Sequence, residues 1–220
     1  MDVRISALYD LTHTRAAEYL SQFTYPWEAL AGISDLVLEI GKALPAEEFD
    51  HPAEDVWIAK DTTVAPTASI TGPCVIGHNT QVRPGAFIRG SALIGDNCVV
   101  GNSTEIKNVI IFDNVQVPHY NYVGDAILGF HAHMGAGSIT SNVKADNKNV
   151  VIKNGEELIE TGRRKVGAML GDYADIGCGS VLNPGVVIGS HTNVYPLSCV
   201  RGVVPPNSIY KDKDNIVEKY

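Results

Sequence analysis

The sequence predicts an all-β protein whose main body is a parallel β-helix of hexapeptide repeats, with a short N-terminal α-helical cap and an inserted β-hairpin arm. Three observations predict it. An aliphatic residue recurs every six positions over two long tracts, the first fifty-odd residues lack this period, and residues 149–169 interrupt it with a hairpin pattern. A fixed short period is the signature of a repeat architecture.

The six-residue period runs unbroken from Ile58 to Ile106 and resumes from Leu170 to Val200. Six is neither a helix period nor a strand alternation. It indicates one buried aliphatic side chain per short flat segment, after which the chain turns. Three such segments would form one coil, with the aliphatic side chains stacked inside it. The repeated residues are Ile58, Val64, Ile70, Ile76, Val82, Ile88, Ile94, Val100 and Ile106, then Leu170, Ile176, Leu182, Ile188, Val194 and Val200.

The N-terminal segment predicts helices instead of coils. Thr12 is expected to cap a helix that runs to about Phe23, and Pro26 to open a second helix that Pro45 ends. Residues 46–55 are acidic and contain proline, which predicts a linker. We expect these helices to cover the open end of the solenoid, because exposed end strands invite aggregation. A role in assembly or in a substrate pocket is the alternative.

The period slips between the two tracts. After Ile106 the next residues in register are Val117 and Val123, and those that follow come one position early. The slips bracket a polar block that contains His119. Irregular segments on rigid scaffolds often carry function, so we expect the chemistry of the protein here.

A hairpin is predicted within the second interruption. Asn154 and Gly155 lie between the apolar runs 150–152 and 158–159, which favours a type I′ turn. The arm would either lie over a neighbouring subunit's site or decorate the solenoid. The predicted organisation is therefore a cap and linker at 1–55, a β-helix at 56–206 with an insertion at 143–169, and a tail at 207–220.

Composition sets mild bounds on function. The 220 residues carry a net charge of −8, which argues against non-specific binding to nucleic acid or anionic membranes. No apolar run reaches the roughly 20 residues that span a bilayer, and no signal segment is recognised, so we expect a cytoplasmic protein. The 4 cysteines form no Cys-x-x-Cys pair, which indicates neither a zinc site nor a disulfide framework. Cys74 and Cys98 are expected to pack inside the coils.

The polar block offers a proton acceptor and two cations stand upstream of it. His119 is flanked by tyrosine and can accept a proton near neutral pH without a metal. Arg83 and Lys107 each follow a buried aliphatic residue, on coils that would stack near that histidine. Two cations there would suit a phosphate or a carboxylate.

Several runs of residues together resemble a known family. Their order and spacing resemble the left-handed β-helix acetyltransferase domain of the bifunctional N-acetylglucosamine-1-phosphate uridylyltransferase/glucosamine-1-phosphate acetyltransferases, over about residues 56–206. Residues 161–168 and 182–189 are most similar to the archaeal-type sugar-phosphate nucleotidylyltransferase/acetyltransferases. The family's nucleotidylyltransferase domain has no counterpart in the match. The runs are Arg83-Pro-Gly, Glu105-Ile-Lys-Asn108, His119-Tyr-Asn-Tyr-Val-Gly-Asp125, Gly135-Ala-Gly-Ser-Ile-Thr-Ser-Asn142 and Asn147-Lys148.

The resemblance implies a left-handed trimer with sites between subunits, acetyl-CoA as acyl donor and an amino-sugar phosphate such as glucosamine-1-phosphate as acceptor. It implies direct transfer with His119 as general base and Asn142 orienting it, and no metal is required for that chemistry. Substrate contacts are implied for Arg83, Lys107, Tyr122, His133 and Lys148, and acetyl-CoA contacts for Ala136, Ser138, Cys178 and Pro196. His133 stands where the bacterial enzymes place a sugar-binding asparagine, and Val143 replaces an aromatic residue.

Two other functions stay open. One is a metal hydratase of the γ-carbonic anhydrase type, which binds zinc through three histidines supplied across a subunit interface, and for which His119, His131 and His133 are available. The other is a catalytically silent subunit that binds a sugar nucleotide or partners a separate nucleotidylyltransferase. The joint presence of His119 and three cations favours the enzyme.

Overall fold

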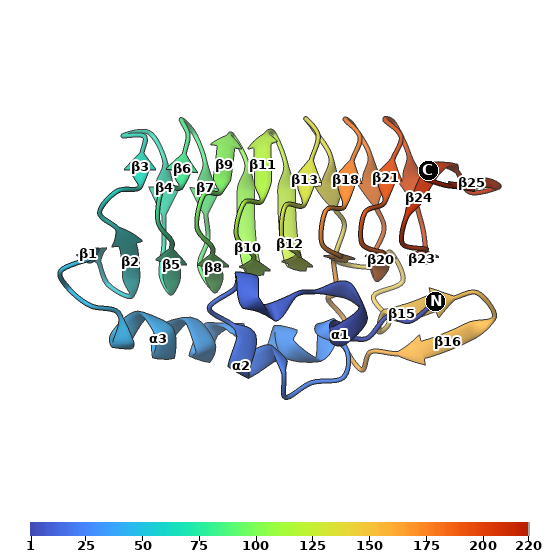
Figure 1. The fold of residues 1–220 in the computed structure, drawn as a ribbon, viewed down its shortest axis with the longest axis horizontal. Helices are drawn as coiled ribbons and strands as arrows, with labels where there is room; N and C mark the ends of the chain where they lie inside the picture. Colours follow the sequence, from blue (N-terminus) through green and yellow to red (C-terminus); the bar gives the residue numbers. More distant parts are fainter. Residues whose placement is uncertain (220) are drawn as a thin grey trace.

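The computed structural model describes residues 1–219, and it confirms the predicted fold class (Figure 1). From residue 56 onward the chain winds into stacked coils whose strands pair in parallel from coil to coil. Each coil contributes short strands to three faces. The helices of the N-terminal segment lie along one side of the stack, and the hairpin arm projects near its C-terminal end (Figure 1).

The three faces are defined here by their strands. Face 1 consists of β2 (Val56–Ala59), β5 (Cys74–Ile76), β8 (Ala92–Ile94), the second halves of β10 (Glu105–Ile111) and β12 (Tyr122–Leu128), β17 (Ala168–Leu170), β20 (Val186–Ile188) and β23 (Val203–Val204). Face 2 consists of β3 (Thr63–Val64), β6 (Gln81–Val82), β9 (Val99–Asn102), β11 (Gln116–His119), β13 (His133–Met134), β18 (Asp175–Ile176), β21 (Asn193–Val194) and β24 (Ser208–Asp212). Face 3 consists of β4 (Ser69–Ile70), β7 (Phe87–Ile88), the first halves of β10 and β12, β14 (Ile139–Thr140), β19 (Val181–Leu182) and β22 (Cys199–Val200).

The slip in the period is a shortened corner. Residues that pair on face 1 lie 18 positions apart in the first coils, as Cys74 and Ala92 do. They lie 17 apart in the next coil, where Ala92 pairs with Val109. The residue is lost between faces 3 and 1, where the interior residue Ile106 is followed by Ile111. Each of β10 and β12 therefore runs through this corner as one strand.

The first predicted helix is wrong in extent and in its cap. The segment forms two short helical turns, Leu11–His13 and Ala17–Leu20, and the first is capped by the side chain of Asp10, which accepts a hydrogen bond from the Thr12 amide. The second predicted helix is confirmed, although it divides at Gly32 and ends at Ala43, before Pro45. The helical elements are α1 (Ile5–Leu8), η1 (Leu11–His13), α2 (Ala17–Leu20), η2 (Pro26–Ala31) and α3 (Ile33–Ala43).

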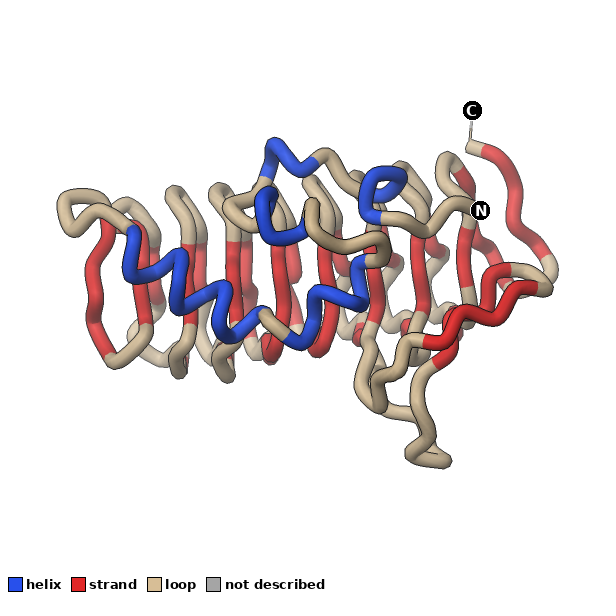
Figure 2. The backbone as a smooth tube through the Cα atoms, turned by 90° about the horizontal axis from the view of Figure 1, so that it is seen from below, coloured by secondary structure: helices blue, strands red, loops and turns tan. Residues whose placement is uncertain are grey.

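The N-terminal helices cover the flank of the solenoid and not its open end, which corrects the expectation from the sequence (Figures 1 and 2). The helices cover face 1 because the outward side chains of this face are apolar, like its inward side chains. Val75, Leu93 and Ile110 point away from the coil interior and are at most 1% exposed. Burying them stabilises the fold at about 25 cal/mol per Å² of apolar surface.

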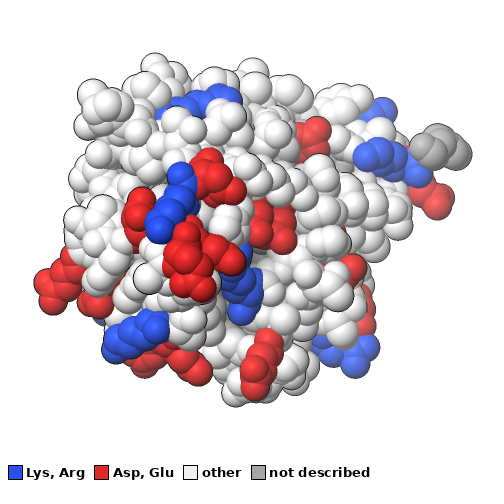
Figure 3. Space-filling view, turned by 60° about the vertical axis from the view of Figure 1, so that its left-hand side comes forward, with Lys and Arg blue, Asp and Glu red and all other residues white. Residues whose placement is uncertain are grey.

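Antiparallel strands close both ends of the stack. The expected linker contains β1 (Phe49–Ala53), which pairs antiparallel with β2. The expected tail contains β25 (Asn215–Glu218), which pairs antiparallel with β24. Acidic side chains gather on the end formed by the first coil (Figure 3), and charge of this kind discourages edge-to-edge pairing.

The inserted hairpin is confirmed, but its turn differs from the prediction. Strands β15 (Val151–Asn154) and β16 (Glu157–Glu160) pair antiparallel, so Gly155 and Glu156 form the two-residue loop. Gly155 alone has a positive φ, 65°, which fits a type II′ turn and not type I′. The arm folds back on its own chain, where Val150 and Ile152 are fully buried.

Two of the cysteines confirm the packing role expected of them. Cys74 and Cys98 are buried within the coils, and burial raises the pKa of the Cys74 thiol to about 12. Within residues 1–219 there is no helix with the length and apolar character needed to cross a membrane.

Candidate functional site

His119 lies at the end of β11, at the corner between faces 2 and 3, with its side chain exposed. Its backbone is held from both sides. The amide donates to Asn121 Oδ1 (3.1 Å), and the carbonyl accepts from the Gly137 amide (2.9 Å). The buried Asn121 in turn donates to the Gly135 carbonyl (2.8 Å). The imidazole is therefore presented to solvent from a fixed corner.

A ladder of backbone hydrogen bonds aligns this corner through successive coils. The Gly137 amide donates to the His119 carbonyl, and the Gly179 amide donates to the Ala136 carbonyl (2.8 Å). In the last coil, the Leu197 amide donates to the Cys178 carbonyl (2.8 Å). Pro196 directly precedes the last of these donors. The structure thus brings His119, Ala136, Cys178 and Pro196 into one exposed column.

A second column runs beside the first and was not predicted. It contains Tyr120, Gly137, Gly179 and Leu197, all with positive φ of 52°, 71°, 67° and 59°. Tyr120 is 62% exposed and Leu197 is 85% exposed. A Cβ on Gly179 would lie 2.9 Å from Leu197 Cδ2, so the leucine side chain lies over that glycine.

The two columns together form a strip of small residues between two large ones. We call Ala136, Gly137, Cys178 and Gly179 the small-residue strip. From Tyr120 to Leu197 it covers three coil steps, or about 14 Å at the usual strand spacing. Large residues in the left-handed region are uncommon, so a tyrosine and a leucine at these turn positions are the sequence signal for the ends of the strip.

Ser138 does not line this strip, which corrects the role implied for it. Its side chain is fully buried, and its Oγ donates to the Gly135 carbonyl (2.7 Å). Ser138 also accepts a hydrogen bond from Asn121 Nδ2 (3.2 Å). The hydroxyl therefore fixes the turn behind His119 and cannot reach a ligand outside the coil.

A second cluster is centred on Asp125, at the corner between faces 3 and 1. The carboxylate is 4% exposed and accepts from Asn108 Nδ2 (2.9 Å) and Asn142 Nδ2 (2.5 Å). Lys107 Nζ lies 3.7 Å from Oδ2, the oxygen to which Asn142 donates. Asp125 was given no role from the sequence, although its place just before the apolar run of β12 marks the shortened corner.

Tyr122 lies on face 3, between the His119 corner and the Asp125 corner. Asn142 Nδ2 donates to its hydroxyl oxygen (3.2 Å). Burial raises the pKa of Tyr122, outweighing that hydrogen bond, so the phenol keeps its proton at neutral pH. Since Asn142 occupies the oxygen as a donor, the phenol hydrogen is available to a ligand.

Asn142 does not contact His119, which corrects its implied orienting role. Its amide nitrogen is directed to Tyr122 and Asp125, across the width of face 3 from the histidine corner. The side-chain oxygen Oδ1 of Asn142 accepts no hydrogen bond from residues 1–219, whereas its backbone carbonyl accepts one from the Val166 amide (3.1 Å). Asn142 therefore belongs to the Asp125 cluster.

The three predicted cations are not brought together within one chain. Arg83 stands at the His119 corner but two coils earlier, and its guanidinium donates to Gln81 (3.3 Å). Lys107 is at the opposite corner beside Asp125. Lys148 lies on the exposed loop before the arm, and its side chain pairs with nothing among residues 1–219.

His133 lies on the outer surface of face 2 and not on face 3. Its Nδ1 is 2.8 Å from Asp175 Oδ1, and Asn193 donates to the other carboxylate oxygen (3.0 Å). The hydrogen bond from His133 lowers the pKa of Asp175. An ionised carboxylate only accepts, so Nδ1 of His133 carries the hydrogen of this bond.

The histidines of the zinc hypothesis are not assembled in the described chain. His131 stacks on Tyr173 with ring centroids 5.3 Å apart, His133 bonds Asp175, and His119 is at another corner. Among residues 1–219, no group of three or more His, Cys, Asp or Glu is arranged to hold a metal ion.

Sequence comparisons find bifunctional proteins among the relatives of the chain and confirm the resemblance seen in the sequence. The GMPPB C-terminal domain family matches residues 70–160. The bifunctional protein GlmU of Methanococcus maripaludis is 37% identical over 118 residues, which are 54% of this chain and 28% of that protein. A bifunctional sugar-1-phosphate nucleotidylyltransferase/acetyltransferase of Sulfurisphaera tokodaii is 30% identical over 158 residues, covering 72% and 38%. The chain thus spans about a third of the length of these relatives.

The solved structures that match the chain are more distant in sequence. A putative acetyltransferase of Bacillus cereus has a TM-score of 0.41 at 18% identity, covering 74% of this chain and 77% of that one. A perosamine N-acetyltransferase of Caulobacter crescentus, solved with CoA and GDP-perosamine, has a TM-score of 0.37 at 19% identity, covering 73% and 55%.

Proposed function

We propose that this protein is an acetyl-CoA-dependent N-acetyltransferase that acts on an amino-sugar phosphate such as glucosamine-1-phosphate, with His119 as the general base. The observation that carries the proposal is the position of His119 at the head of the small-residue strip. A pantetheine chain is long and thin, and a strip without large side chains would let it lie against the coil. The name of the Sulfurisphaera tokodaii relative, a bifunctional sugar-1-phosphate nucleotidylyltransferase/acetyltransferase, supports the same activity.

The proposed reaction is a direct transfer between the two substrates. His119 takes a proton from the sugar amine as its nitrogen attacks the thioester carbonyl. The C–N bond forms, the C–S bond breaks, and the CoA thiol leaves with a proton. Orientation of the amine against the thioester supplies much of the rate enhancement, and general base catalysis adds about 10²–10⁴-fold.

The acceptor would lie on face 3 between His119 and the Asp125 cluster. The phenol hydrogen of Tyr122 and the side-chain oxygen Oδ1 of Asn142 offer one donor and one acceptor for sugar hydroxyls. Lys107, whose side chain is 28% exposed beside Asp125, offers a positive charge to the phosphate. Arg83 and Lys148 are too distant in one chain to join them, so their implied roles require a neighbouring subunit.

We further propose that three copies of the chain form a trimer and that the protein is cytoplasmic. Shared sites would explain why one chain presents the proposed base and the scattered cations on separate surfaces. Sedimentation equilibrium on the full chain measures the mass directly, and a monomer would remove Arg83 and Lys148 from the acceptor site.

The activity is tested by CoA release from acetyl-CoA with a panel of amino-sugar phosphates, including glucosamine-1-phosphate and galactosamine-1-phosphate. We expect turnover with at least one acceptor. His119→Ala should lower kcat by at least 100-fold while the circular dichroism spectrum is unchanged. The matched control is His191→Ala, since His191 is also an exposed corner histidine but lies between faces 1 and 2.

Two outcomes would overturn this proposal. Nearly full activity in His119→Ala would remove the histidine from catalysis. Silence across the panel, together with no binding of acetyl-CoA, would instead favour the catalytically silent sugar-nucleotide-binding subunit.

A further inference from the structure

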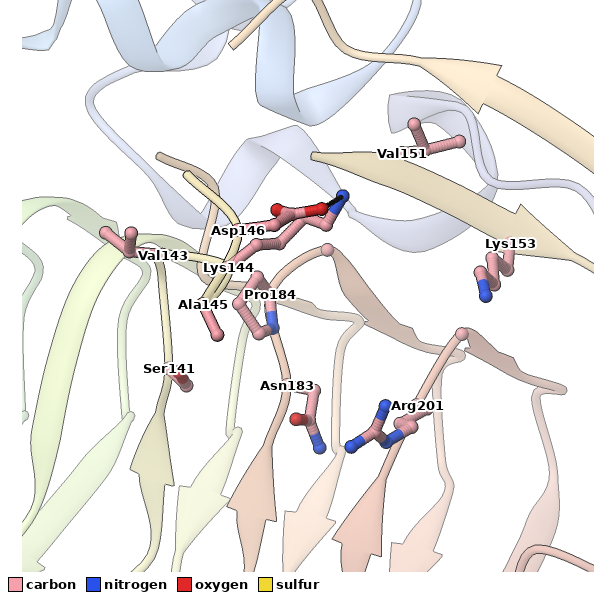
Figure 4. A pocket seen from close by; sticks show the side chains of 12 residues that line it. Ser141, Val143, Lys144, Ala145, Asp146, Val151, Lys153, Asn183, Pro184 and Arg201 are labelled. Atoms are coloured by element: carbon pink, nitrogen blue, oxygen red, sulfur yellow. Dashed lines mark ion pairs between the residues drawn. The ribbon is translucent and has the colours of Figure 1, made fainter. Parts of the chain in front are cut away.

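A cavity of about 610 Å³ lies between the hairpin arm and the lower coils, away from His119 (Figure 4). Its floor is the corner between faces 3 and 1, where Asn183 and Arg201 follow the interior residues of β19 and β22. Its roof is the loop and first strand of the arm. The lining consists of Ser141, Val143, Lys144, Ala145, Asp146, Val151, Lys153, Asn183, Pro184, Gly185, Arg201 and Gly202.

The charge of this lining is opposite to that of the whole chain. Lys144, Lys153 and Arg201 face one acidic residue, Asp146, whereas the chain carries a net charge of −8. Lys144 is paired with Asp146 at 3.4 Å. The side chains of Lys153 and Arg201 form no hydrogen bond or ion pair with residues 1–219, so two positive charges remain unbalanced.

The arm and the corner are fixed against each other, so the cavity is a built feature. Val150 and Ile152 of the arm are fully buried. They pack on Gly185, where a Cβ would lie 2.6 Å from Val150 Cγ1. A Cβ on Gly202 would lie 2.8 Å from the Lys153 carbonyl oxygen. Both glycines have positive φ, 79° and 76°, so the sequence admits this close approach at both points.

The two unpaired cations come from opposite walls. Figure 4 shows Lys153 reaching from the arm and Arg201 lying beside Asn183 on the corner below it. Asn183 uses its amide nitrogen on the Val200 carbonyl (2.8 Å), which holds the side chain flat along the corner. A guanidinium binds a phosphate through two parallel hydrogen bonds, and an ammonium adds a point charge.

We propose that this cavity binds the phosphate group of a small phosphate ester, clamped between Lys153 and Arg201. Val143, Ala145 and Pro184 supply apolar surface for the carbon part of the ligand. The volume is within the range of about 300–1,000 Å³ that is usual for small-molecule sites. The site stands apart from the His119 corner, so ligand binding here needs no acetyl transfer.

The probe for the site is inorganic pyrophosphate, measured by isothermal titration calorimetry on the full chain at low ionic strength. We expect Lys153→Gln and Arg201→Gln each to weaken binding by about tenfold, as loss of one charge-assisted contact does. Arg164→Gln is the matched control, because Arg164 is an exposed cation of the same arm that does not line the cavity. Affinity should also fall as salt is added.

Two sources of the phosphate are separated by further titrations. Glucosamine-1-phosphate represents the sugar phosphates, and CoA compared with dephospho-CoA represents the 3′-phosphate of the acyl donor. The source is the compound whose binding both variants weaken and Arg164→Gln does not. No pyrophosphate binding by the wild-type chain, or equal binding by wild type and both variants, overturns the site. His119→Ala should bind pyrophosphate normally, so failure of the proposed transferase leaves this test intact.

Discussion

Asn142 Nδ2 donates to the buried carboxylate of Asp125 at 2.5 Å, which ties the chain just before the insertion to the shortened corner of β12. Asn108 donates to the same carboxylate at 2.9 Å from the coil above. Asp125 therefore joins three successive coils at the edge of the proposed acceptor surface. The neighbouring Tyr122 takes its position from the same asparagine.

Replacement of Asp125 with asparagine should damage both stability and acceptor binding. An amide at this position would face the amide nitrogens of Asn108 and Asn142, so one buried donor would lose its partner. We expect urea unfolding to give a free energy of unfolding lower by about 2 kcal/mol. The KM for the sugar phosphate should rise, because Asn142, which also positions Tyr122, loses its carboxylate partner. Asp214→Asn is the exposed control and should match the wild type.

Leu197→Gly should trade affinity for stability. The backbone at Leu197 has a φ of 59°, a left-handed conformation that costs an ordinary residue about 1–2 kcal/mol. Glycine relieves this strain, but it loses more chain entropy on folding, which costs about 0.5–1 kcal/mol. We expect a net gain of about 0.5 kcal/mol in unfolding free energy and a raised KM for acetyl-CoA. Asn97→Gly, at a φ of 55° on a distant corner, should leave the kinetics unchanged. An unaltered KM in Leu197→Gly would remove the leucine from the end of the strip.

Asp175 should make the free energy of unfolding depend on pH in the acidic range. Its folded-state pKa is lowered, chiefly by the hydrogen bond from His133. Such a group stabilises the fold above its unfolded pKa of about 3.9 and loses that contribution as pH falls through the folded value. In a carboxyl titration followed by NMR, His133→Gln should return the Asp175 pKa toward its ordinary value. A titration that does not move would show that the imidazole is not the cause.

The outward side of face 1 should tolerate charge far less than the outward side of face 2. Leu93→Asp would place a carboxylate under the N-terminal helices, and we expect a loss of at least about 3 kcal/mol in unfolding free energy. Gln116→Asp makes the same kind of change at an exposed outward position on β11 and should cost less than about 0.5 kcal/mol. Similar losses in the two variants would mean that the helices contribute little to the stability of the coils.

The repeat could be predicted from the sequence because one side chain per segment fixes it. Every aliphatic residue at six-residue spacing, such as Ile76, lies on an inward position. The corner between Ile106 and Ile111 was harder, since a deletion that tightens a turn and an interruption that opens a cleft produce the same slip in the period. The apolar pairs of face 1, such as Val75 with Ile76, carry the signal for a covering layer, which the six-residue count alone does not use.

The candidate site was predictable only residue by residue. Ala136 and Cys178 fall beside His119 because each occupies the same corner position in a successive coil, although the insertion separates the last two in the sequence. The orienting role predicted for Asn142 was wrong. The resemblance identifies the residue, but it does not say that this chain places Asn142 at the corner of face 3 opposite His119. Ser138 failed for a similar reason, because sequence spacing does not say which hydroxyl the coil needs for its own turn.

The contacts of the N-terminal segment determine when it can pack during synthesis of the chain. The carbonyl of Leu8 accepts hydrogen bonds from the Asp172 amide (3.0 Å) and from Ser190 Oγ (3.0 Å), the latter 182 positions later in the chain. During synthesis the first helices leave the ribosome well before these partners exist. The apolar side chains of α1 therefore find their late partners only after residues 172 and 190 have been made, whereas α3 packs against β5, β8 and β10 of the early coils.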